Sequence, residues 1–231
     1  MLLVGLTDPV YAAYILITFL VSFTLHEFAH VVAADVLGDH TSRERGRYTI
    51  NPFAHLDKWG TLLMMTLGMG WGKPVPIDPT RFQGVSPKVG MGIVGIAGPI
   101  VNLVLALLIA LPLQFKLFPF VPQKIGPIFW SWGEFASVFF IMNIGLAVFN
   151  MIPFGPLDGS RVLNAFLPDK WFEFSARIEI PLLVLFFAVI LFDRFFNNFE
   201  LLGRLISPVT CDAWWLFIKY SPTSILPFCG A

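Results

Sequence analysis

The chain has 231 residues, of which 56% are hydrophobic and only 13% are charged. This composition is far more apolar than that of soluble globular proteins, so it argues against a water-soluble fold and predicts an integral, multi-pass membrane protein. Fifteen basic residues balance fifteen acidic ones, so the net charge suggests neither a nucleic-acid partner nor a polybasic membrane anchor.

Membrane-spanning helices are the first elements that the sequence predicts. A span needs about 20 mostly apolar residues. Four stretches meet this requirement: residues 11–37, 89–113, 128–152 and 178–196. The residues before the first span contain no Lys or Arg, unlike a secretory leader, so we expect this span to stay in the mature protein. The predicted fold class is an all-α membrane protein, a helical bundle of about four spans that forms a single domain over residues 1–231.

Two segments outside these spans are predicted to lie at the membrane surface. The connection 38–88 has an apolar middle, 62–72, that is too short and glycine-rich to cross, so we expect a re-entrant or interfacial segment. Residues 48–50 favour a short β-strand, whose edge could take an extended substrate; a plain surface loop is the alternative. The C-terminal residues 201–231 mix aromatic and apolar side chains, which predicts an interfacial or partly spanning segment.

The basic residues of the loops predict the orientation. None precedes the first span, whereas the connection 38–88 carries Arg43, Arg45, Arg47, Lys58, Lys73, Arg81 and Lys88. The positive-inside rule therefore places this connection in the cytosol. The loop after the third span follows on the same side, although Lys116 and Lys124 weakly oppose this scheme. We expect a prokaryotic cell membrane, with the chemistry described next toward the cytosolic leaflet.

Three ionisable residues within the first span form the pattern H-E-x-x-H: His26, Glu27 and His30. At about 100° per residue, the two histidines lie about 40° apart around the helix, so both imidazoles can reach one ion. Glu27 lies roughly 60° beyond His30, near the ion without binding it. This arrangement suits metal-assisted hydrolysis, with two nitrogen ligands and a carboxylate that accepts a proton from water. The competing interpretation is a polar lining for an ion or proton path.

A catalytic zinc site normally takes a third protein ligand. Asp35 lies on the opposite face of the first helix from His26, while His55 and Asp57 in the long connection are possible. Asp158 is the better candidate, because prolines and glycines around it break the chain after the third span and can turn a carboxylate back toward the first. The alternative is an ordinary turn, for which P-L-D-G is an adequate sequence.

Two motifs in this order resemble the site-2 protease family of intramembrane zinc metalloproteases. That family pairs H-E-x-x-H on one span with N-x-x-P-x-x-x-L-D-G on a later one, which correspond here to residues 26–30 and 150–159. The segments NPFAHLD (51–57), GWGKPVPID (70–78) and AGPIVN (97–102) are also similar to family members. The sequence has no room for the PDZ or CBS domains that some relatives carry, so the resemblance is to a minimal form.

The resemblance implies that His26, His30 and Asp158 bind one zinc ion per chain and that Glu27 activates the water. Three further residues are candidates for binding the substrate or the oxyanion: Asn150, His55 and Asn102. Each has a structural alternative. Asn102 stands beside small residues that favour close helix packing, Asn150 could be a polar contact between helices, and a loop histidine such as His55 is often only solvated.

The function that follows is hydrolysis of peptide bonds in or near the transmembrane segment of another membrane protein, in regulated intramembrane proteolysis. Two rival functions remain open. The same residues could form the metal-ion or proton site of a transporter or channel, although only one broken span is evident. An inactive homologue that sequesters membrane proteins is the other, which the presence of Glu27 argues against. The sequence predicts neither the oligomeric state nor whether Cys211 pairs with Cys229.

Overall fold

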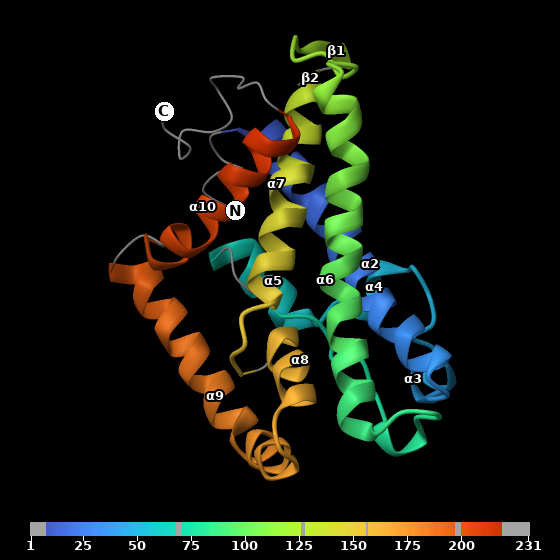
Figure 1. Ribbon diagram of the computed structural model, residues 1–231. Coiled ribbons are helices and arrows are strands. Elements are labelled where there is room, and N and C mark those ends of the chain that lie inside the picture. The colour runs from blue at the N-terminus through green and yellow to red at the C-terminus, as the bar shows by residue number, and fades with distance from the viewer. Residues whose placement is uncertain (1–7, 68–70, 126–127, 156, 197–199, 219–231) are drawn as a thin grey trace.

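The computed structural model describes residues 8–67, 71–125, 128–155, 157–196 and 200–218, and these ranges are mainly helical (Figure 1). The long helices are α2 (Pro9–Val36), α6 (Pro87–Gln114), α7 (Trp132–Asn150), α9 (Asp169–Phe196) and α10 (Glu200–Phe217). Shorter helices are α3 (Thr41–Glu44), α4 (Pro52–His55), α5 (Lys58–Leu67), η1 (Pro79–Arg81) and α8 (Asp158–Phe166). Strands β1 (Gln123–Ile125) and β2 (Ile128–Trp130) form an antiparallel hairpin. The predicted all-α fold class is confirmed.

Three helices, α2, α6 and α7, are long and apolar enough to cross a membrane. Large apolar side chains cover the outer face of α6; Leu108 and Leu111, for example, are 63% and 56% exposed. A continuous apolar surface of this kind is unfavourable in water and suits contact with lipid. Residues 178–196, the predicted fourth span, lie within α9, and that α9 crosses the membrane stays a prediction.

Helix boundaries follow from local capping. The Asp8 carboxylate accepts hydrogen bonds from the backbone N–H groups of Val10 and Tyr11 and so begins α2. The predicted start of the third span at residue 128 is wrong, because residues 128–130 pair with β1 and α7 begins only after Ser131, whose hydroxyl caps the helix. Apolar composition alone could not separate this strand from the helix that follows it.

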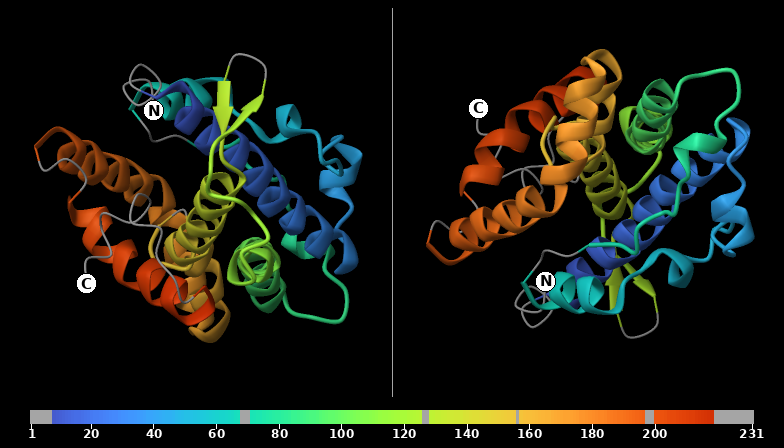
Figure 2. Two further views of the ribbon diagram at one scale, coloured as in Figure 1. Left: turned by 90° about the horizontal axis from the view of Figure 1, so that it is seen from above. Right: turned by 90° about the horizontal axis from the view of Figure 1, so that it is seen from below.

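Helices α6 and α7 pack side by side at the centre of the molecule. Helix α2 lies on one side of this pair and α9 and α10 lie on the other, while α8 follows α7 and packs against the first half of α6 (Figures 1 and 2). This arrangement places the middle of α2, the first half of α6 and the start of α8 together, although they are far apart in sequence.

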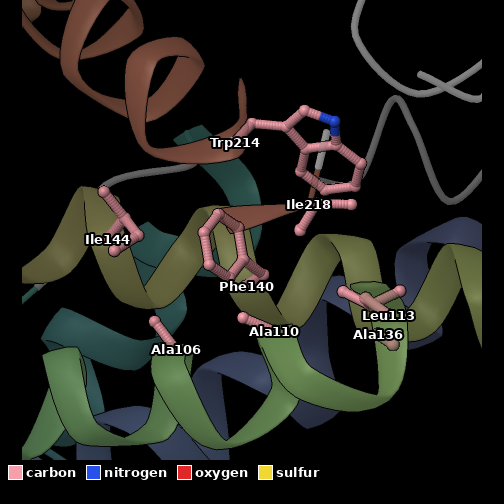
Figure 3. Close-up of a cluster of buried hydrophobic side chains, with 8 residues drawn as sticks. All are labelled: Ala106, Ala110, Leu113, Ala136, Phe140, Ile144, Trp214 and Ile218. Atoms are coloured by element: carbon pink, nitrogen blue, oxygen red, sulfur yellow. The ribbon is translucent and has the colours of Figure 1, made fainter. Parts of the chain in front are cut away.

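A core of buried apolar side chains joins the second half of α6 to α7 and α10 (Figure 3). Phe140 of α7 packs edge to face against Trp214 of α10, with ring centroids 5.8 Å apart. On α6, Ala106 and Ala110 lie beneath them and let the helices approach closely. This core lies on the part of α6 toward its C-terminal end, so it holds the helix pair together while the first half of α6 stays available for α2 and α8.

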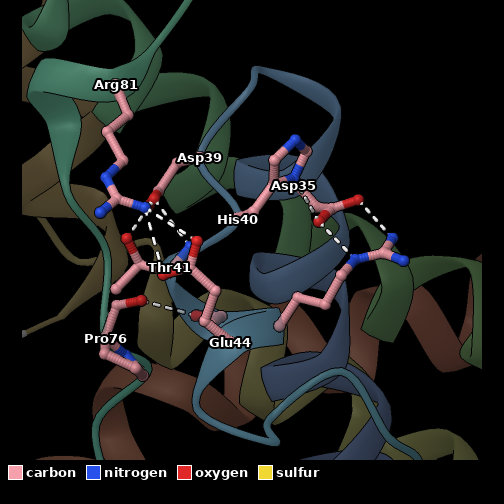
Figure 4. Close-up of polar contacts among 9 residues, drawn as sticks. Asp35, Asp39, His40, Thr41, Glu44, Pro76 and Arg81 are labelled. Carbon is pink, nitrogen blue, oxygen red and sulfur yellow. Dashed lines mark hydrogen bonds and ion pairs between the residues drawn. The ribbon is translucent and has the colours of Figure 1, made fainter.

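The connection 38–88 is tied to itself by side chain to backbone hydrogen bonds. Buried Asp39 accepts from the N–H and hydroxyl of Thr41 and from the N–H of Asp78, and the Ser42 hydroxyl donates to the carbonyl of Pro76 (Figure 4). These bonds hold the segment after residue 72 against the segment that leaves α2. The described parts of the connection on either side of residues 68–70 are therefore tied together beside the C-terminal end of α2.

Residues 48–50 form no strand, so the plain loop, which the sequence left open beside a strand, is what the structure has there. The Thr49 carbonyl instead accepts from the His55 ring, and the Asn51 side chain caps α4. Among the described residues of this connection, the isolated bridge between Leu56 and Gly72 is the one β-type pairing. The apolar segment 62–72 falls partly outside the described residues, and the part that is described belongs to helix α5 and the bridge.

The C-terminal segment is described as far as residue 218. Helix α10 packs against α7 and so contributes to the core. Cys211 on this helix is disulfide-bonded, whereas Cys229 lies outside the described residues. That residues 201–231 lie at the interface stays a prediction.

Candidate metal centre

Three side chains from two distant parts of the chain converge beneath the bundle surface. The Nε2 atoms of His26 and His30 lie 3.1 Å apart, and Oδ2 of Asp158 lies 3.1 Å from the first and 3.3 Å from the second. All three residues are buried. Among the described residues they form a group of ligand atoms, all within 4.8 Å of one another, that could hold a metal ion.

The Nδ1 atoms of both histidine rings, which point away from the centre, contact hydrogen-bond acceptors. These contacts fix how the rings face the centre. His30 Nδ1 lies 2.7 Å from the Val94 carbonyl of α6. A carbonyl only accepts, so Nδ1 carries the proton and Nε2 presents a lone pair. His26 Nδ1 lies 2.6 Å from Oδ1 of Asn102, also on α6. Metal-binding histidines are commonly oriented by such hydrogen bonds from the nitrogen that does not bind.

The centre therefore gathers acceptors without a donor between them. Oδ2 of Asp158 is a buried atom with no hydrogen-bond partner, and the Nε2 lone pair of His30 points at the same place. Acceptors this close repel one another unless a cation or a shared proton lies between them. Two imidazoles and one carboxylate are a donor set that catalytic zinc sites use, with the fourth position left open. The residues present thus fit a zinc ion.

A sharp turn delivers Asp158 to the two histidines. The chain reverses at Gly155, whose φ of 53° is in the left-handed region that favours glycine, and the Ser160 hydroxyl donates to the Gly155 carbonyl and closes the turn. At Gly159, a Cβ would lie 2.3 Å from the Met151 carbonyl, so only glycine lets α8 begin this close to the end of α7. Asp158 is the first residue of α8.

Glycines on α6 make room for both halves of the centre. A Cβ at Gly95 would lie 3.1 Å from the Asp158 carbonyl, and one at Gly98 would lie 2.6 Å from His30 Nε2 and 2.7 Å from His26 Nε2. The missing side chain of Gly98 therefore leaves open the space that a bound ion and its open coordination position need. A close approach of this kind is a principal reason for glycine inside a membrane helix.

Gly98→Ala is expected to lower zinc affinity by at least about 10-fold, comparable with the loss of an orienting contact at a metal site. The new methyl group overlaps both Nε2 atoms, so the rings must turn away. Zinc content and competition with a chelator measure the effect. Gly145→Ala on α7 is the matched control, because its Cβ would meet only Ile206 at 3.7 Å, an ordinary contact. Equal zinc affinity in the two variants would show that the space at residue 98 is not used.

Glu27 lies next to the centre without belonging to the group of three. Its side chain is partly buried, and among the described residues its carboxylate makes no hydrogen bond or ion pair. Helix geometry places it adjacent to the two histidines, as the sequence predicts. The carboxylate is thus available to a molecule that enters the site.

The three weaker candidates occupy different places. Asn102 is fully buried and contacts the ring of His26, so it supports the centre directly. His55 is fully buried, with Nδ1 3.5 Å from Arg47 Nη2 and Nε2 2.8 Å from the Thr49 carbonyl. Asn150 donates to the Leu146 carbonyl within its own helix. Roles for these residues in binding the substrate or oxyanion stay predictions.

Asp57, which the sequence left possible as a ligand, and Asp35, which its helix face excluded, have structural partners elsewhere. Asp35 pairs with Arg43 and His40, and Asp57 accepts from the backbone N–H groups at the start of α5. Sequence reasoning did not single out Asn143, which lies on α7 and contacts Asn102. An asparagine in the middle of an apolar span was the available signal, because buried polar groups in membranes need partners.

Comparisons with known proteins agree with this site. A family model described as "Peptidase family M50" matches residues 121–191, which include Asp158. "Putative zinc metalloprotease YwhC" from Bacillus subtilis is 37% identical over 155 residues, 67% of this chain and 69% of that protein. "Putative zinc metalloprotease Rip2" from Mycobacterium tuberculosis is 31% identical over 188 residues, 77% of this chain and 68% of that protein. The Rip2 of Mycolicibacterium smegmatis is 31% identical over 154 residues, which are 64% of this chain and 55% of that protein.

No solved structure matches the chain. The identities and the shares of each chain that they cover are sufficient to assign the family. The chain belongs to peptidase family M50.

Proposed function

We propose that this zinc metalloprotease cuts peptide bonds in or near the transmembrane segments of other membrane proteins, with one zinc ion per chain. The observation that carries the proposal is the position of the candidate metal centre within a membrane-spanning helix. His26 and His30 lie in α2, one of the three helices able to cross a membrane, roughly 15 Å and 9 Å along the axis from its C-terminal end at Val36. A substrate must therefore meet these residues at membrane depth.

The depth and the loop charges together favour a site toward the cytosolic leaflet. The end of α2 near the centre leads into the connection 38–88, which carries most of the basic residues before α6. Basic loops stay in the cytosol by the positive-inside rule. The short distance from the centre to this end gives water a short route into the site, which hydrolysis requires.

We assign His26, His30 and Asp158 as the zinc ligands and Glu27 as the catalytic base. Zinc, when bound, supplies a Lewis acid that polarises the scissile carbonyl and makes water a better nucleophile at neutral pH. Glu27 accepts the proton of the attacking water and returns it to the leaving amine. The two imidazoles and the Asp158 carboxylate hold the reacting groups in fixed positions. The buried surroundings strengthen each electrostatic interaction.

The transporter alternative uses the same residues for ion passage. Membership of a peptidase family and the names of the relatives favour the protease. The Glu27 carboxylate, which makes no hydrogen bond or ion pair among the described residues, also fits a base that waits for water.

Purified protein reconstituted in liposomes with a single-span substrate tests the proposal. We expect about one zinc ion per chain, as a mononuclear site requires, and products whose new termini fall within or beside the substrate span when they are identified by mass spectrometry. A zinc chelator should abolish cleavage, and zinc should restore it. Cleavage confined to soluble loops of the substrate would overturn the intramembrane assignment, and zinc flux without any cleavage would favour the transporter.

A further inference from the structure

We propose that Asn143 of α7 is a positioning residue for the metal centre, acting through Asn102 to hold His26 in the ring form that can bind zinc. This inference rests on the proposed function, since it concerns one of the assigned ligands. Asn143, Asn102 and Ser22 are all fully buried between α2, α6 and α7. Their side chains form a hydrogen-bond chain that ends on the His26 ring.

The direction of this chain is fixed at its far end by a backbone carbonyl. The side-chain nitrogen of Asn143 lies 2.8 Å from the Phe139 carbonyl and 2.8 Å from the Ser22 hydroxyl. A carbonyl oxygen only accepts hydrogen bonds, so the group of Asn143 that faces it must be the NH2. The amide oxygen of Asn143 therefore points the other way, toward Asn102.

The orientation of Asn143 determines that of Asn102, and Asn102 in turn determines the ring form of His26. The Asn143 oxygen lies 2.9 Å from the Asn102 side-chain nitrogen, which must donate to it and which also faces the Ser22 carbonyl at 3.4 Å. Asn102 then presents its oxygen to His26 Nδ1 at 2.6 Å. Two oxygen or nitrogen lone pairs at this distance would repel, so Nδ1 carries the proton. In the neutral ring, His26 Nε2 then keeps its lone pair, which is directed at the metal centre.

The two histidines thus reach one ring form by different means. His30 is held by the backbone carbonyl of Val94, which no side-chain substitution removes. His26 is held by the Asn102 amide, whose orientation depends on the acceptors that face its nitrogen: the Asn143 oxygen at 2.9 Å and, at a longer distance, the Ser22 carbonyl at 3.4 Å. The structural alternative is that Asn143 only joins helices through polar contacts. The alternatives differ in what each substitution of Asn143 does to His26.

Asn143→Leu removes the acceptor that orients Asn102 and replaces the amide with a larger apolar group of the same branched skeleton. We expect zinc affinity to fall about 10-fold to 100-fold, the usual effect of losing an outer hydrogen bond at a zinc site. In metal-free protein, nitrogen-15 NMR of the histidine rings should show that His26 loses its pure Nδ1–H form while His30 retains it. Asn143→Asp, buried as the neutral acid, keeps an oxygen facing Asn102 and an O–H facing the Phe139 carbonyl, so it should restore the His26 ring form and most of the affinity.

Ser137→Ala is the control on the same helix. Ser137 is fully buried, and its hydroxyl donates to the Gly133 carbonyl rather than to the chain that ends at His26. Zinc affinity and both ring forms should be unchanged in this variant. If Asn143→Leu does not fold, Asn143→Ala makes the same test with a smaller change.

A folded Asn143→Leu or Asn143→Ala variant with wild-type zinc affinity and an unchanged His26 ring form would overturn the inference. An Asn143→Asp variant that perturbs the His26 ring form as strongly as the apolar variants would also overturn the inference. If Asn143 served only in packing, a buried carboxyl group would be at least as disruptive as an apolar side chain. Failure of the proposed function is distinguishable. If the proposed function fails, wild-type protein will bind no zinc. The His26 ring form is measured in metal-free protein, so it tests the role of Asn143 separately.

Discussion

Glu27→Gln is expected to leave zinc bound and to reduce substrate cleavage by at least about 10²-fold to 10⁴-fold, the usual contribution of a general base. The amide has nearly the same shape as the carboxylate but cannot accept the proton of the attacking water. Zinc should remain because the three converging ligand atoms belong to His26, His30 and Asp158. Cleavage of the single-span substrate in liposomes and the metal content of the same sample are the two measurements.

Glu44→Gln is the matched control for removing one carboxylate near the same end of the bundle. Glu44 is exposed and pairs with Arg81 at 3.2 Å, so its loss should leave both cleavage and zinc content near the wild-type values. Exposed ion pairs of this kind contribute little. Glu27→Gln protein that retains zinc and cleaves at the wild-type rate would show that another group accepts the proton.

The helical framework could be predicted because spans are long and their apolar composition is distinctive. Predicted residues 11–37 and 89–113 agree with α2 (Pro9–Val36) and α6 (Pro87–Gln114) to within two residues at every end. The β-hairpin before α7 was missed because three apolar residues in a short strand resemble the start of an apolar helix. At residues 48–50 the loop alternative holds instead of the strand, and the His55 ring occupies the Thr49 carbonyl that a neighbouring strand would need as an acceptor.

The ligand group was partly a local property of the sequence. His26 and His30 share a helix face by their spacing alone, so their proximity needed no tertiary information. Asp158 was suggested by the broken chain around it and by the family resemblance, and the structure brings it to the histidines. In contrast, the contact of Asn143 with Asn102 depends on how α6 and α7 are rotated against each other, which apolar periodicity in a membrane span does not specify.

Loss of zinc is the expected result of Asp158→Asn, with metal content falling from about one ion per chain to about a tenth or less after dialysis, since a catalytic site keeps only three protein ligands. The amide is a weak ligand and carries no negative charge. Its NH2 group can also donate toward the two Nε2 atoms that lie 3.1 Å and 3.3 Å from Oδ2 in the native chain. In this variant, hydrogen bonds from the introduced amide therefore take the place of the bound zinc ion.

Thermal unfolding of the same variant should separate this explanation from general damage. Metal-free wild type keeps a buried carboxylate oxygen without a partner, which is destabilising, whereas the amide satisfies the same space. Metal-free Asp158→Asn protein should therefore unfold at a temperature equal to or above that of metal-free wild type, and added zinc should stabilise only the wild type. Asp57→Asn, which alters a carboxylate that caps α5, should retain zinc. If Asp158→Asn protein retained zinc and Asp57→Asn protein lost it, the third ligand would be Asp57 in the long connection and not Asp158.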